Sequence, residues 1–294
     1  MSKACLFFLS LILLLGAVAP ASAESANPGQ LSSWKVVKKK AFPNYNVEIL
    51  ERWMMGKFPR IDSMKARIVP KEGGSVTEFE ATWLTPDPRE FVVGWKEGQV
   101  LDMNGDGLED LVLRSSTGGA HCCYSYDIFS LAKPLKKLGE VELQDCGEQI
   151  VLHDLNGDKK PEIISCDAKF TYLGDLPYAQ SPFPPAIYTL GLSGYERADQ
   201  AFKQVYQEDL ARQRQILQQG FKPAAALQIA TDYFLMGDEK KGWEEFNALY
   251  QGADKEKIRL QLLQKMGLKI PGAESAPANP LGSSAAPVES TESL

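Results

Sequence analysis

The stretch VLDMNGDGLEDLVL, residues 100–113, returns in altered form as VLHDLNGDKKPEIIS, residues 151–165. In both copies an Asp-x-Asn-Gly-Asp loop, starting at Asp102 and again 52 residues later at Asp154, runs directly into an apolar segment of strand-like composition. A second apolar segment and a hairpin-like return follow each copy: 124–131 and 138–143, then 186–190 and 195–198. A repeat of this length, built from short strands, is typical of propeller blades or stacked β-units.

Two units cannot close a propeller, so we expect the preceding strands to supply further sheet. The region 34–95 has short alternating apolar segments separated by turn signals. Residues 65–69 and 77–83 flank a Pro-Lys-Glu-Gly-Gly turn at 70–74, which predicts an antiparallel hairpin.

The spacing of apolar residues changes from 2 to about 3.6 at Asp199, which predicts helices from there onward. Glycines divide this region into four short helices, although the signature residues of a tetratricopeptide repeat do not align. The expected fold class is α+β, with a β-rich domain of propeller-blade-like antiparallel repeats and a small C-terminal helical subdomain. The expected boundaries are 24–198 for the β-rich domain, 98–145 and 149–198 for its repeats, 199–270 for the helices, and 271–294 for a disordered tail.

Both repeated loops place oxygen-bearing side chains at alternate positions, as a chain does when it wraps one hard divalent cation. Gly105 and Gly107 permit backbone angles that other residues resist. The carbonyl of the seventh loop residue and the carboxylate of the ninth would complete the shell. The expected calcium ligands are Asp102, Asn104, Asp106, Leu108 and Asp110 in the first loop, and Asp154, Asn156, Asp158, Lys160 and Glu162 in the second.

An EF-hand is excluded because it needs flanking helices and a glutamate at its twelfth position, which here is Leu113. Closure at the ninth residue, inside a strand, instead resembles the FG-GAP or VCBS repeat of integrin α-chain propellers and many bacterial exported proteins. The resemblance covers residues 98–198, about a third of the chain. It implies blade-like repeats and calcium ligands at the ten positions named above.

The second loop departs from this pattern at Lys159, where glycine is usual. If that position needs a positive φ, lysine costs about 1 kcal/mol, and the two lysines at 159–160 offset part of the carboxylate charge. We therefore expect the second site to be weaker or empty. The alternative for both loops is a metal-free connector, since Asp, Asn and Gly all favour turns. A bound calcium would be structural, with an affinity of about 10⁻⁴–10⁻³ M.

Residues 1–23 predict a signal peptide. Lys3 precedes an apolar run at 6–18, and Ala21-Ser22-Ala23 supplies the small-x-small cleavage pattern. The run is too short for a hydrocarbon core of about 30 Å, although an N-terminal membrane anchor is the alternative. No later segment is apolar enough to span a membrane. We expect cleavage after Ala23 and a mature chain in the periplasm or outside the cell.

Export would place four cysteines in an oxidising compartment, where an even number favours disulfides. The expected arrangement is two bridges that link the vicinal pair Cys122 and Cys123 to Cys146 and Cys166. A Cys122–Cys123 bridge is disfavoured because it needs a strained eight-membered ring, and the other alternative is four reduced thiols. A soft-metal or redox centre would use His121, His153 and these cysteines. No Cys-x-x-Cys pair supports such a centre.

The net charge of −6 argues against a nucleic-acid partner, because such binding depends on clustered Lys and Arg. No nucleophile-elbow, zinc-protease or phosphate-loop motif occurs. The expected function is that of an exported calcium-binding interaction module that recognises a protein or glycan partner. The alternatives are a carbohydrate-active or other hydrolytic enzyme with catalytic carboxylates on its loops, and the redox or soft-metal protein.

Overall fold

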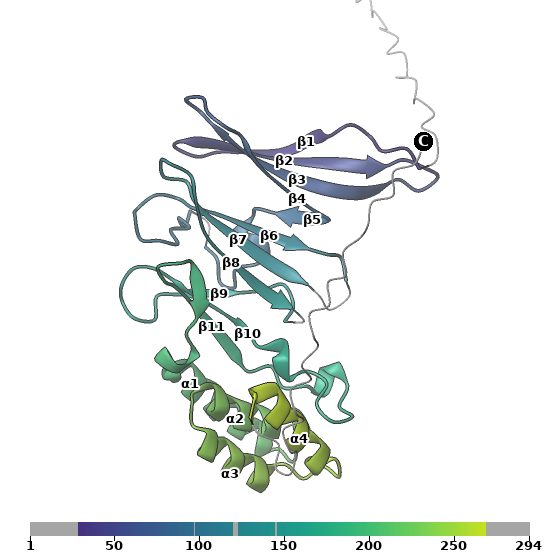
Figure 1. Ribbon diagram of the computed structural model, residues 1–294, viewed down its shortest axis with the longest axis vertical. Coiled ribbons are helices and arrows are strands. Elements are labelled where there is room, and N and C mark those ends of the chain that lie inside the picture. The colour runs from purple at the N-terminus through teal and green to yellow at the C-terminus, as the bar shows by residue number, and fades with distance from the viewer. Residues whose placement is uncertain (1–28, 97, 120–122, 145, 269–294) are drawn as a thin grey trace, which may run out of the picture.

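A computed structural model describes residues 29–96, 98–119, 123–144 and 146–268, and in these residues three four-stranded antiparallel sheets are followed by four helices. Figure 1 shows the sheets stacked along the long axis, with the helices at one end. This arrangement confirms the expected α+β fold class, in which a β-rich part precedes a small helical part.

Each sheet is a meander in which strands that follow one another in the chain lie side by side. Sheet 1 contains β1 (Lys35–Ala41), β2 (Tyr45–Met54), β3 (Arg60–Pro70) and β4 (Thr77–Ala81). Sheet 2 contains β5 (Trp83–Thr85), β6 (Leu111–Ser116), β7 (Tyr124–Ser130) and β8 (Lys136–Gln144). Sheet 3 contains β9 (Val151–His153), β10 (Glu162–Cys166), β11 (Pro185–Leu190) and β12 (Tyr195–Arg197).

Sheet 1 is the further unit expected before the two repeats. Its hairpin is confirmed, since Lys65 of β3 pairs with Glu80 of β4. The expected strand 77–83 was wrong at its end, because the chain leaves sheet 1 after Ala81 and Trp83 begins β5, where it pairs with Ser116 of sheet 2. An alternating pattern cannot distinguish one strand from two consecutive strands that pair with different partners.

The middle sheet buries both of its faces. Along β6, Leu111 and Leu113 pack toward sheet 1, while Val112 packs toward sheet 3. Phe129 and Ile128 divide in the same way on β7. Successive side chains of a strand point to opposite faces, so a strand covered on both sides reads as a continuous apolar run. Leu-Val-Leu directly after the first Asp-rich loop is such a run.

The two ends of the stack are closed differently. The outer face of sheet 1 carries a cross-strand row of charges, Glu48, Arg67 and Glu78, in which the Arg67 and Glu78 side chains lie 2.9 Å apart. At the other end α1 covers sheet 3, where the Tyr206 hydroxyl donates to the Pro185 carbonyl over 2.9 Å. The charged outer face of sheet 1 and the helices on sheet 3 thus end the stack, whereas the blades of a propeller close into a ring.

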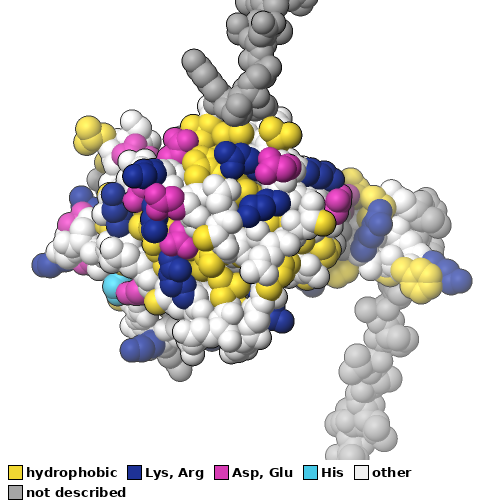
Figure 2. Space-filling view, turned by 90° about the horizontal axis from the view of Figure 1, so that it is seen from below, with side chains coloured by type: hydrophobic (Ala, Val, Ile, Leu, Met, Phe, Trp, Pro, Cys, Tyr) yellow, Lys and Arg dark blue, Asp and Glu magenta, His cyan; other side chains and the backbone are white. Residues whose placement is uncertain are grey.

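The helices are α1 (Lys203–Leu217), α2 (Pro223–Leu235), α3 (Glu239–Leu249) and α4 (Lys255–Met266), and short 3-10 turns lie at Pro88–Glu90, Ala168–Phe170, Tyr178–Gln180 and Asp199–Ala201. As expected, glycine ends α4, where Gly267 has a φ of 69°. Figure 2 looks at the helical end, where Lys and Arg side chains are interspersed with Asp, Glu and apolar side chains.

No helix in the described part of the chain is long and apolar enough to cross a membrane. The expected signal peptide at 1–23 and the expected tail at 271–294 lie outside the described residues.

The expected disulfide pairing was wrong. Cys146 and Cys166 are bonded to each other, with their Cα atoms 5.5 Å apart. The stacking of sheet 2 on sheet 3 brings the end of β8 next to the end of β10, within the usual range for a disulfide. Cys123 is also disulfide-bonded, so its partner is neither of these two, and the alternative of four reduced thiols is wrong as well. Cys122 lies outside the described residues.

Candidate calcium loops

The two Asp-rich loops occupy equivalent places in two successive sheets. The first loop, residues 102–110, precedes β6, and the second loop, residues 154–162, precedes β10. Both therefore lie between the first and second strands of their own meander. In sheet 1 the same connection is the short turn between β1 and β2.

The two loops share one backbone hydrogen-bond pattern. The first aspartate of each loop accepts bonds from three successive amides. Asp102 accepts from Gly105, Asp106 and Gly107 at 2.8, 3.2 and 2.8 Å. Asp154 accepts from Gly157, Asp158 and Lys159 at 2.7, 3.1 and 3.0 Å. The sequence repeat is therefore also a repeat of loop conformation.

The fourth and sixth loop positions have left-handed backbones in both copies. Gly105 and Gly107 have φ values of 74° and 83°, and Gly157 and Lys159 have values of 81° and 68°. Position 159 thus has the positive φ on which the expected penalty for lysine depended.

The closing carboxylate of the first loop is buried and only half satisfied. Asp110 is 2% exposed, and its Oδ2 accepts from the Met103 amide over 2.8 Å. Its Oδ1 has no hydrogen-bond donor among the described residues, although the nearby Leu131 amide lowers the pKa of the group somewhat. Burial first, and then the neighbouring Asp106 and Asp102, raise the pKa of this carboxyl to about 7. A buried carboxylate with an incomplete set of donors is costly, so this oxygen is available to a cation.

The closing carboxylate of the second loop is satisfied by the protein itself. Glu162 is fully buried, and its Oε2 accepts from the Leu155 amide over 2.8 Å. Its Oε1 accepts from the Thr189 hydroxyl at 3.0 Å and from the Asn156 amide at 3.4 Å. Asn156 and Glu162, which are both expected calcium ligands, are therefore already hydrogen-bonded to each other. This loop has less need of a cation.

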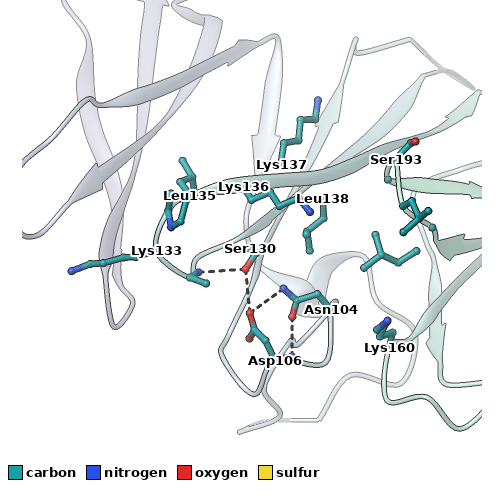
Figure 3. Close-up of a pocket in the computed structure, with 16 residues that line it drawn as sticks. Asn104, Asp106, Ser130, Lys133, Leu135, Lys136, Lys137, Leu138, Lys160 and Ser193 are labelled. Carbon is teal, nitrogen blue, oxygen red and sulfur yellow. Dashed lines mark hydrogen bonds between the residues drawn. The ribbon is translucent and has the colours of Figure 1, made fainter.

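No three Asp, Glu, His or Cys side chains within the described residues already converge as a metal shell. In the first loop Asp106 instead accepts from the Asn104 amide at 3.0 Å and from the Ser130 hydroxyl at 3.3 Å (Figure 3). Asp106 is exposed, and Asn104 is partly exposed. A calcium shell therefore requires these two surface side chains to turn toward Asp102 and Asp110.

The two loops are tied together by residues that the sequence did not single out. A Cβ atom on Gly105 would lie 3.4 Å from the Lys159 carbonyl, so the loops touch. The Tyr195 hydroxyl lies 3.1 Å from the Met103 carbonyl and 3.3 Å from the Pro161 carbonyl. Burial, and after it the carboxylates of Asp110 and Glu162, raise the pKa of Tyr195. An aromatic residue in a short strand was the only local signal for this role.

The soft-metal alternative loses most of its ligands. Cys123, Cys146 and Cys166 are all in disulfides, which leaves them without thiolates for a metal. His153 is exposed on β9. His121 lies outside the described residues.

No protein-family model matches the chain, and no curated protein or solved structure is significantly similar to it. The resemblance to FG-GAP and VCBS repeats therefore rests on the loop spacing and remains a prediction.

Proposed function

We propose that the chain is an exported interaction module whose stack of sheets is stabilised by one calcium ion in the first loop, and that it recognises a protein or glycan partner. The observation that carries the calcium proposal is the buried Asp110 Oδ1, which forms no hydrogen bond within the described residues and belongs to a carboxylate whose pKa the nearby Asp106 and Asp102 raise. The loop spacing and the FG-GAP-like repeat support it.

The energetic argument concerns the cost of burying a carboxylate without a partner. A calcium ion on Asp110 would satisfy the free oxygen and offset the repulsion among Asp102, Asp106 and Asp110. These ligands converge only when β6 is folded onto its neighbours, so ion binding would stabilise the folded chain. The Asn104 side chain and the Leu108 carbonyl would supply the remaining oxygens.

The proposed role as an interaction module is supported by the mixed charges on the surface of the helical end and by the signal-peptide pattern. The described residues form a stack with two closed ends, and the helical end mixes both signs of charge (Figure 2). The signal-peptide pattern at 1–23 supports export. N-terminal sequencing of protein recovered from an envelope or culture fraction is expected to begin at Glu24; retention of the apolar run would contradict cleavage.

The calcium proposal is tested by thermal unfolding of the EDTA-treated mature chain with and without calcium. At a concentration about 100 times Kd, one ion adds about 2.7 kcal/mol, which should raise Tm by roughly 5–10 °C. Asp110→Asn should abolish this rise. Glu162→Gln is the matched control in the second loop and should keep it.

Two results would contradict the proposal: a wild-type Tm that does not respond to 10 mM calcium (about 100 times 10⁻⁴ M, the tighter end of the range for extracellular modules), or an equal rise in the Asp110→Asn variant. Magnesium at the same concentration should give a smaller rise, because its octahedral shell dehydrates reluctantly.

A further inference from the structure

A cleft of about 800 Å³ lies beside the first calcium loop (Figure 3). It is bounded by that loop, by Lys160 of the second Asp-rich loop, by the β7–β8 turn and the start of β8, and by the β11–β12 turn. The two turns meet closely, since a Cβ atom on Gly139 would lie 2.7 Å from the Tyr195 amide nitrogen. The volume is within the range of small-ligand and peptide-anchor sites.

Two of the lysines that line this cleft have no acidic partner. Lys133 pairs with Glu72, and Lys137 pairs with Asp127. No acidic side chain of the described residues lies within ion-pair distance of Lys136 or Lys160. Figure 3 shows the ends of both side chains directed into the space between the two turns. The cleft therefore holds positive charge that no ion pair among the described residues neutralises.

The acidic residue of the cleft is turned away from these lysines. Asp106 accepts hydrogen bonds from Asn104 and Ser130 at the other side of the cleft (Figure 3). In the proposed calcium-bound loop its charge would be taken up by the ion. An incoming anion would thus meet Lys136 and Lys160 without competition from the Asp106 carboxylate.

Apolar side chains form the rest of the lining. Leu138, Leu190 and Leu192 border the cleft, and Leu192 at the tip of its turn is 105% exposed. No aromatic side chain lines the cleft within the described residues. Sugar rings commonly stack on aromatic faces, so the lining favours a peptide over a glycan.

We propose that the cleft binds a peptide segment of a protein partner in which an Asp or Glu lies beside an apolar residue. The carboxylate would accept charge-assisted hydrogen bonds from Lys136 and Lys160, and the apolar side chain would pack against the three leucines. This inference rests on the proposed role as an interaction module and narrows its partner to a protein with an acidic–apolar segment.

The test is a selection of a phage-displayed random heptapeptide library on the full mature chain in calcium. Peptides with Asp or Glu next to Leu, Ile or Val should be enriched. A selected peptide, synthesised with a fluorophore, should bind at least tenfold more weakly to the Lys136→Gln/Lys160→Gln double variant in fluorescence polarisation. Lys203→Gln/Lys240→Gln, which removes two exposed lysines of the helices, is the matched control and should bind as the wild type does.

Absence of acidic enrichment, or an equal loss of binding in the control variant, would overturn the proposal. Binding of an oligogalacturonate that is lost in the cleft variant, without peptide enrichment, would assign the cleft to acidic glycans and overturn it too. The calcium-dependent Tm of the same preparations separates the two proposals. A Tm rise without peptide binding refutes the cleft alone, and peptide binding without a Tm rise refutes calcium alone.

Discussion

Asp110 and Glu162 occupy the same position in two copies of one loop, yet their surroundings supply different hydrogen-bond donors. Thr189 and Asn156 donate to the Glu162 Oε1, whereas the Asp110 Oδ1 has no donor within the described residues. Glutamate is one methylene longer than aspartate, so it reaches partners that a shorter side chain does not. A loop with an internally satisfied carboxylate has less need of an ion, which is why we propose calcium for the first loop only.

Lys159→Gly should stabilise the protein. Lys159 is exposed with a φ of 68°, and removing its Cβ relieves a left-handed strain of about 1–2 kcal/mol. The greater freedom of glycine in the unfolded chain offsets about 0.5–1 kcal/mol, so the expected net gain is at most about 1.5 kcal/mol. Chemical denaturation measures it. Lys160→Gly, next to it and without a positive φ, should destabilise, and a gain in both variants would refute the explanation by strain.

Asp232→Asn should stabilise the protein at high pH. Asp232 is fully buried in α2, and neither carboxyl oxygen has a donor among the described residues. Burial raises the pKa of this carboxyl from 3.8 to about 8, with Arg212 opposing the rise. The native state therefore holds a proton that the unfolded chain releases, and wild-type stability should fall as pH rises from about 4 to 8.

Denaturation at pH 5 and pH 9 measures this effect. Asparagine does not titrate, so the variant should lose the fall in stability and exceed the wild type at pH 9, each pKa unit being worth about 1.4 kcal/mol. Asp209→Asn is the control, because the Asp209 carboxylate accepts from Gln228 over 2.6 Å and its loss should destabilise at both pH values. Equal pH slopes in wild type and Asp232→Asn would contradict the assignment.

At the scale of elements, contact between sheets 2 and 3 depends on close backbone approach as well as on apolar packing. A Cβ atom on Gly139 of β8 would lie 2.7 Å from the Tyr195 nitrogen, and one on Gly194 would lie 2.9 Å from the Leu138 carbonyl. The Cys146–Cys166 disulfide joins the same two sheets. Together these contacts fix the position of Leu138, which borders the cleft, and of Tyr195, whose hydroxyl contacts both Asp-rich loops.

Gly139→Ala should destabilise the protein by about 1–3 kcal/mol, because the added methyl group must separate two backbones. It should also weaken binding of the selected peptide, since the cleft is built on this contact. Gly56→Ala is the control: a Cβ atom there meets nothing within 4 Å. Denaturation measures the stability, and fluorescence polarisation measures the affinity for the peptide. A Gly139→Ala variant as stable as the wild type would show that β8 and β12 can move apart at no cost.

At the scale of the whole molecule, the chain covers the faces of its blade-like sheets without closing them into a ring. Sheet 2 is covered on both faces, sheet 1 turns a row of ion pairs outward, and the helices cover sheet 3. The calcium loop and the cleft lie on one side of this stack and share Asp106 and Asn104. Binding at one should therefore influence binding at the other.

Calcium should tighten binding of the selected acidic peptide by about fivefold, the lower end of typical coupling between sites. The ion would neutralise Asp106 at the cleft, and reciprocity requires the peptide to tighten calcium binding by the same factor. Fluorescence polarisation with and without calcium, at matched ionic strength, measures the coupling. Asp110→Asn should bind the peptide without any calcium effect. An unchanged Kd in the wild type would show that the two sites are independent.

The sequence alone determined the features that depend on local spacing. Alternation and turn residues predicted the strands after each loop, and the change of period at Asp199 predicted the helices that begin at Lys203. The duplicated motif predicted two similar loops, and it made the cost of Lys159 depend on a positive φ that the structure then showed. Each of these follows from residues within a few positions of one another, because backbone angles and strand periodicity are local properties.

Only the tertiary structure decided which distant groups meet. The partner of Cys146 depends on which strand ends the stacking brings together, and the number of hydrogen bonds to Asp110 depends on donors from other strands. Thr189, which satisfies Glu162, comes from the neighbouring strand β11. Lys136 begins β8 and Lys160 lies in the second Asp-rich loop, and the two line one cleft only because sheet 2 stacks on sheet 3. Such pairings are set by the packing of whole sheets, which no local pattern encodes.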